Sequence, residues 1–173
     1  MRASNRAVDV VLDAPASVSI YLQALLRADR RADAIAVTRA HEKASRLAAE
    51  RLAQLGGWTS AQEPEMPAPH RYDATPLEVV LVLHTPPEHP GLHAHLVTET
   101  ETEVIELQRA VPSVRAQFFR DLGDTLATAL GLQLELSSGV PQLTGVPPHL
   151  AEELELLPCR VRSGAAQIRF VLS

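Results

Sequence analysis

The chain has 173 residues, of which 46% are hydrophobic and 21% charged, and its formal net charge at pH 7 is −5. This length suits one domain (1–173), no apolar run reaches the ~20 residues that span a bilayer, and the acidic balance excludes an indiscriminate basic nucleic-acid coat. Cys159 is the only cysteine, which excludes an internal disulfide and a multi-cysteine zinc site, so we expect a cytoplasmic protein without membrane partners.

The first half of the chain predicts one short strand followed by two helices. Val8 to Leu12 has the apolar character of a strand, and a proline and a serine then precede an apolar-periodic segment that predicts a helix near 14–27. A longer helix is expected over 31–55, with Ile35 among the residues that partly follow one face, and two glycines end it. The stretch 58–76 holds four prolines among polar residues and predicts a mobile loop.

The second half alternates strands and helices. The clearest helix is 112–130, because apolar residues repeat at four-residue spacing and Gly131 follows as the expected C-terminal glycine. The other predicted elements are strands at 77–84, at 92–98 with an extension through 99–107, and at 132–136, a short helix over 147–154, and closing strands within 160–171.

This order of elements predicts an α/β (α+β) fold. We expect a central, mainly antiparallel sheet covered by the helices near 14–27, 31–55 and 112–130.

Histidines cluster in one short window of the chain. His93 and His95 are separated by one residue in an apolar strand, so their side chains point to the same face. His84 ends the preceding strand, and the connection 85–91 is rich in proline and suits a turn that returns the chain alongside. A third imidazole would then join the pair from the neighbouring strand, which predicts a three-histidine metal site.

Four segments in the same order resemble motifs of one protein family. Asp9-Val-Val-Leu-Asp-Ala-Pro-Ala-Ser-Val-Ser19 is similar to Asp-x-x-Phe-Ser-Ala-Pro-Lys-Ser-Val-Ser, and His89-Pro-Gly-Leu-His-Ala-His-Leu-Val97 to Asp-Pro-x-Leu-His-x-His-Val-Val. Phe118 to Glu135 and Leu143-Thr-Gly-Val-Pro147 are similar to the two motifs that follow. The chain therefore resembles, over about 9–152, the TrwC/TraI-type (MobF class) conjugative relaxases, which are HUH endonucleases.

The resemblance implies a metal-dependent nicking reaction on single-stranded DNA in plasmid conjugation or mobilisation. His84, His93 and His95 would hold one divalent ion (Mg, Mn or Zn) that polarises the scissile phosphate while a tyrosine attacks it. Asp9 would match the catalytic aspartate that orients a histidine or activates the nucleophile.

The sequence also departs from the family pattern. The family's tyrosines precede the aspartate motif, but only eight residues stand before Asp9 here and none is a tyrosine. By this resemblance the chain is either a relaxase core that has lost its first strand and helix, or one whose tyrosine segment lies on a separate polypeptide. The two tyrosines of the chain are Tyr21, expected in the core, and Tyr72, expected in the loop.

Two rival functions therefore stay open: a degenerate, non-catalytic relaxase-like binding or regulatory protein, and a metal-dependent phosphohydrolase that uses water. For single-stranded DNA we expect a local basic groove lined by Arg115, Arg120 and Arg71. We expect His41 and His149 on helix surfaces.

Overall fold

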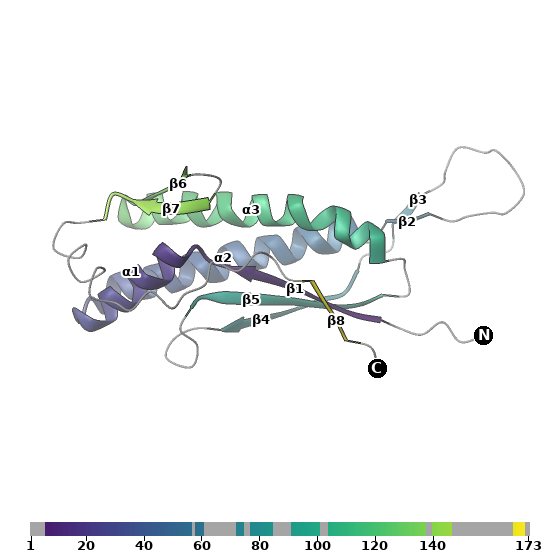
Figure 1. Ribbon diagram of the computed structural model, residues 1–173, viewed down its shortest axis with the longest axis horizontal. Coiled ribbons are helices and arrows are strands. Elements are labelled where there is room, and N and C mark those ends of the chain that lie inside the picture. The colour runs from purple at the N-terminus through teal and green to yellow at the C-terminus, as the bar shows by residue number, and fades with distance from the viewer. Residues whose placement is uncertain are drawn as a thin grey trace, which may run out of the picture.

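A four-stranded sheet with one layer of helices on a single face forms the centre of the molecule (Figure 1). The computed structural model describes residues 6–56, 58–60, 72–74, 77–84, 91–100, 104–137, 140–146 and 168–171. The strand order is β4 (Val79–His84), β5 (His93–Thr100), β1 (Arg6–Asp13) and β8 (Ile168–Val171), and every pair is antiparallel. The predicted α+β fold with a mainly antiparallel sheet is confirmed.

The two faces of the sheet differ in burial. Along β1 and β5 every second side chain is buried against the helices: Val8, Val10, Leu12, Ala94, Leu96 and Thr98. The alternate residues point to the opposite face and are half-buried, and no described helix lies on that face (Figure 1). Within the described part of the chain no element covers this face of the sheet, and we call it the open face.

Three helices cover the other face: α1 (Ala16–Arg27), α2 (Arg31–Gly56) and α3 (Val104–Leu130). Half of the buried residues of α2 are alanines, whose small side chains let α3 approach closely. The large buried side chains of α3 that fill the remaining space are Phe118, Leu122 and Leu126. None of the described helices is both long enough and apolar enough to cross a membrane.

The structure corrects the expected buried face of α2. Ile35 is 52% exposed, whereas Ala34, Val37 and His41 are buried. The prediction of His41 as a surface residue is therefore wrong. The cause is that the buried stripe runs through small residues and His41 between Val37 and Leu52, so that it passes beside Ile35.

The structure also corrects the start of α3, which begins at Val104 rather than at Pro112. The expected strand extension through 99–107 is wrong for the same reason, since β5 ends at Thr100. A proline in a helix removes one hydrogen bond and disfavours the turn before it. Here that turn stays helical because Leu107, Ala110 and Val111 are buried.

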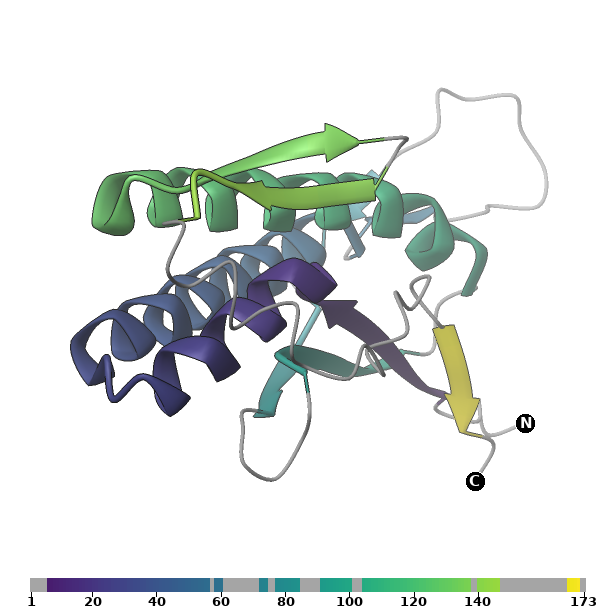
Figure 2. The ribbon, with the colours of Figure 1, turned by 60° about the vertical axis from the view of Figure 1, so that its left-hand side comes forward.

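A hairpin of β6 (Gln133–Ser137) and β7 (Val140–Thr144) runs along α3 on the side away from the sheet (Figure 2). Gly131 adopts a positive φ of 68° and its N–H donates to the carbonyl of Ala127, which confirms the expected helix end. Strand β6 was expected and β7 was not.

Within the predicted loop 58–76 the structure describes two short strands, while residues 61–71 and 75–76 lie outside the described residues. β2 (Trp58–Ser60) and β3 (Tyr72–Ala74) form an antiparallel pair. The closing strand expected within 160–171 is confirmed as β8, which pairs with β1. The expected helix over 147–154 lies outside the described residues, as do Cys159 and His149.

Candidate metal centre

Three histidines converge on the open face, where β4 and β5 lie side by side. His84 stands directly opposite His93 in the antiparallel register, and His95 lies two residues along β5 on the same face. The ring centroids of His84 and His93 are 4.7 Å apart. The ring centroid of His95 lies 5.1 Å from that of His84 and 5.3 Å from that of His93. One nitrogen of each ring lies within 4.8 Å of the others. The structure thus brings the three predicted ligands together.

Hydrogen bonds orient the two histidine rings of β5. Nδ1 of His95 lies 3.0 Å and 2.8 Å from the two carboxylate oxygens of Asp9, and Nδ1 of His93 lies 3.2 Å from the carbonyl oxygen of Gly91. Because these oxygens only accept hydrogen bonds, each Nδ1 carries the proton and donates it. In the neutral form of each ring Nε2 keeps a lone pair, and this is the form of imidazole that binds a metal ion.

The donor set fits a divalent cation. A histidine nitrogen binds zinc at about 2.0–2.1 Å, so nitrogens around one ion stand about 3–4 Å apart, which small side-chain rotations reach from the observed spacing. Among the described residues, no other group of three histidine, cysteine or acidic side chains comes together in this way. Asp9 holds the ring of His95, which is the position expected of an orienting aspartate.

Two serines of the Ser-Val-Ser motif tie the first turns of α1 to other elements. Oγ of Ser19 accepts the backbone N–H of Leu92 at 3.1 Å in a buried position, directly before His93. Oγ of Ser17 accepts the N–H of Leu143 in β7 at 2.9 Å. Neither caps α1, whose N-cap residue is Pro15. These long-range contacts give the motif a structural role that its sequence alone does not reveal.

Asp13 is a residue of this site that the sequence analysis did not single out. It ends β1 and lies directly opposite His93 in the register of β1 and β5. Burial raises the pKa of its carboxyl group, whereas His93, Arg115 and His95, the histidines in their protonated form, act against that rise. The sequence could have indicated Asp13, because it follows Asp9 by four residues in one strand and this spacing places both carboxylates on the same face.

A groove of about 720 Å³ lies between α3 and the β6–β7 hairpin. Arg115 and Arg120 both line it among mainly apolar residues. The guanidinium of Arg115 lies 5.4 Å from the centre of the Phe119 ring, and Arg120 donates a hydrogen bond to Oε1 of Gln117 at 3.3 Å. Two of the arginines expected to bind DNA thus share one groove, while Arg71 lies outside the described residues.

Tyr21 is in the core, as expected, with 4% of its surface exposed. It belongs to α1, on the helical side of the sheet, whereas the histidines occupy the open face. Burial and the charge of Asp33 raise the pKa of its hydroxyl group, against the opposing effect of Arg30. Tyr21 is therefore buried on the other side of the sheet from the histidines, and its hydroxyl group keeps its proton. Both properties make it unsuited to act as the attacking nucleophile at the histidines.

Comparisons with known proteins find the likeness in structure rather than in sequence. No protein-family model and no curated protein sequence matches the chain. The metal-bound complex of the conjugative relaxase TrwC with oriT DNA matches with a TM-score of 0.60 and 24% identity, covering 87% of this chain and 53% of that chain. The metal-free complex matches with a TM-score of 0.59 and 24% identity, covering 85% and 52% of the two chains.

A TrwC complex with a 27-mer DNA that comprises the recognition hairpin and the cleavage site also matches. Its TM-score is 0.56 and its identity 22%, over 86% of this chain and 54% of that chain. The chain thus spans about half the length of the relaxase chains that it matches. Over that half, the chain has the fold of a TrwC-type relaxase domain.

Proposed function

We propose that the chain binds single-stranded DNA and that His84, His93 and His95 hold a divalent cation at a backbone phosphate, as part of a relaxase-type nicking site. The convergence of three imidazoles on the open face of this fold carries the proposal. The matched TrwC structures are complexes with oriT DNA, and one of them is metal-bound, which supports both DNA and a cation as ligands.

Each residue of the site has a separate task in this proposal. A divalent cation would supply Lewis-acid polarisation of the phosphate and neutralise its charge. Asp9 keeps the His95 ring in the metal-binding orientation. Arg115 and Arg120 supply positive charge to a neighbouring part of the DNA strand, and the Phe119 ring offers a flat surface for a base.

The attacking group must come from elsewhere. Transesterification requires a tyrosine hydroxyl within about 3 Å of the phosphorus, and Tyr21 is held in the core. We therefore propose that the attacking tyrosine is not Tyr21 but belongs to a segment that docks at the histidines, on this or on another polypeptide. Plasmid conjugation or mobilisation is the process that such a site serves.

The test is fluorescence anisotropy of labelled single-stranded oligonucleotides at low salt, with and without Mn²⁺. We expect Mn²⁺ to strengthen binding by the wild type, and a His93→Ala/His95→Ala variant to lose that gain because two of the three ligands are removed. Val80→Ala is the matched control, since Val80 is 54% exposed on the same face and offers no ligand. Calorimetry with Mn²⁺ alone checks the ion directly.

Equal Mn²⁺ uptake by the wild type and the double variant would refute the metal assignment. Failure to bind any single strand would leave the relaxase likeness as one of fold only, in favour of a partner-binding protein. The same mixtures, denatured and run on a gel, should show no covalent adduct. Shortened oligonucleotides without an adduct would instead support the phosphohydrolase function.

A further inference from the structure

Two carboxylates bracket the histidine pair of β5. In the register of β1 against β5, His95 faces Val11, so Asp9 and Asp13 occupy the two positions diagonal to it. Asp9 uses its position to accept the Nδ1–H of His95. Asp13 occupies the other diagonal and also directly faces His93. The second carboxylate thus stands at the opposite side of the histidine pair from the first.

Asp13 stands near the three ligands without being one of them. Asp13 directly faces His93 in the register and lies on the same face of the sheet as the histidines. Within the described part of the chain, however, the group of possible metal-ligand atoms that lie within 4.8 Å of one another contains one nitrogen from each of the three histidines and no oxygen of Asp13. This register places Asp13 next to the ligand group, where an acidic side chain can accept hydrogen bonds from water on a cation.

We infer that Asp13 is a further positioning residue of the metal centre, which raises its affinity for divalent cations and orders the hydration water of the ion. This inference rests on the metal site of the proposed function. The matching position of the relaxase motif is a serine, so this carboxylate is a feature of the present chain. Three neutral imidazoles do not compensate the positive charge of a bound cation, and the negative charge of Asp13 would do so in part.

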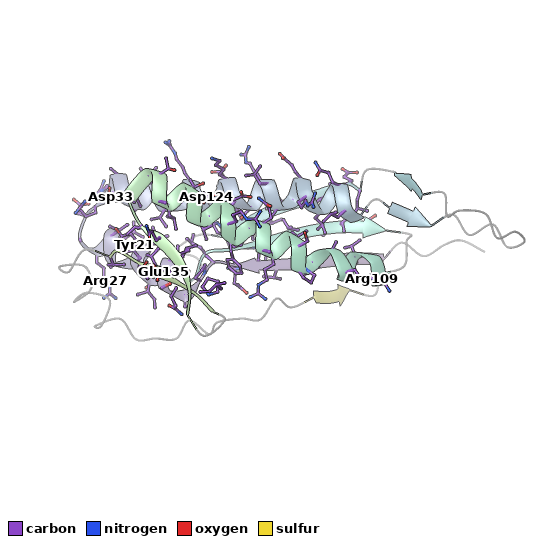
Figure 3. The ribbon with its side chains drawn as sticks, turned by 90° about the horizontal axis from the view of Figure 1, so that it is seen from above. Tyr21, Arg27, Asp33, Arg109, Asp124 and Glu135 are labelled. Atoms are coloured by element: carbon purple, nitrogen blue, oxygen red, sulfur yellow. The ribbon has the colours of Figure 1, made fainter. Side chains whose placement is uncertain are left out.

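The test compares Mn²⁺ binding by the wild type with binding by Asp13→Asn and Asp13→Ser. Asp13→Asn keeps the size and removes the charge, and Asp13→Ser installs the residue of the relaxase motif. The control is Asp124→Asn, which removes one negative charge from the exposed surface of α3 (Figure 3). Calorimetry gives the affinity, and water proton relaxation enhancement reports how firmly water is held on the bound Mn²⁺.

We expect both Asp13 variants to bind Mn²⁺ about 10-fold more weakly, with a lower relaxation enhancement per bound ion. Asp124→Asn should stay within about twofold of the wild type, because an exposed, distant charge is screened by salt. Urea unfolding of each variant identifies any variant that fails to fold. If Asp13→Asn fails to fold, the Mn²⁺ affinity of Asp13→Ser decides the outcome.

Unchanged affinity and relaxation in a folded Asp13 variant, beside a wild type that binds Mn²⁺, would overturn this inference and leave the proposed function standing. An equal loss in Asp124→Asn would also overturn it, since the effect would then reflect net charge. A wild type that binds no Mn²⁺ would instead refute the metal site and the inference together.

Discussion

His41 is a fully buried histidine in the middle of α2. Neither of its ring nitrogens, nor Oγ of Ser45 one turn later, has a hydrogen-bond partner among the described residues. Its ring meets Phe118 edge-on, with centroids 5.9 Å apart and an interplanar angle of 90°. Burial, with a smaller effect of the charge of His93, lowers the pKa of His41 to about 4. The side chain is therefore neutral at pH 7.

This single residue makes the stability of the fold depend on pH. The unfolded chain takes up a proton at His41 near pH 6.5, whereas the folded chain does so only near pH 4. The contribution of His41 to stability is thus fully present above about pH 6.5 and is lost as the pH falls towards 4. Over this window the wild type should lose about 3 kcal/mol more of its unfolding free energy than His41→Leu.

Urea denaturation at closely spaced pH values, with a chelator present, measures this difference. Ser45→Ala serves as the control, because it also changes a buried polar group of the same helix but removes no titrating group. Parallel pH profiles for the wild type and His41→Leu would contradict the prediction.

At the scale of elements, the position of β5 depends on α1. The buried hydrogen bond from Leu92 to Ser19 fixes the chain one residue before His93. The bond from Leu143 to Ser17 fixes β7 in the same way, but on the far side of α1 from the histidines. One motif therefore holds both the metal centre and the hairpin that borders the groove.

Removing each serine hydroxyl should separate these two effects. Ser19→Ala leaves a buried N–H without a partner and should cost about 1–3 kcal/mol of unfolding free energy. It should also weaken Mn²⁺ binding, because β5 is freed beside His93. Ser17→Ala should cost no more stability and leave Mn²⁺ affinity unchanged. Urea unfolding and calorimetry on both variants check this, and equal Mn²⁺ affinities for the two would contradict it.

Local patterns predicted those elements whose stability comes from near neighbours. The alternation of His93 and His95 gave their shared face, and the four-residue apolar repeat gave most of α3. The start of α3 was wrong because burial of Leu107 outweighs the effect of Pro112 on the preceding turn. The place of β8 beside β1, and of Asp13 beside His93, follows from pairing between distant segments, which local patterns do not encode.

At the scale of the whole molecule, positive charge is local while the net charge is −5. The groove between α3 and the β6–β7 hairpin holds Arg115 and Arg120, together with Glu135, on the side of α3 away from the sheet. Under the proposed function this groove contacts DNA phosphates, so the affinity for a single strand should fall as salt rises.

Arg115→Gln/Arg120→Gln should reduce the slope of log affinity against log salt by about 1.4, because each phosphate contact of a single strand contributes about 0.7. Arg27→Gln/Arg39→Gln is the control, since both arginines are exposed and neither lines the groove. Anisotropy titrations over a range of salt concentrations give the slopes. A similar reduction of the slope in the control variant would show that the arginines of the groove contribute no more to DNA binding than other exposed arginines.

The edge position of β4 has a consequence for the dynamics of the sheet. In the described part of the chain β4 pairs only with β5, so this strand can open without disturbing the rest of the sheet. The three histidines are divided between these two strands, with His84 on β4 and the other two on β5. A shared cation is thus a cross-link across the last ladder of the sheet. At a metal concentration 100 times its dissociation constant, this cross-link would oppose the opening of β4 by about 2.7 kcal/mol, so that the edge strand exchanges its amide hydrogens about 100-fold more slowly.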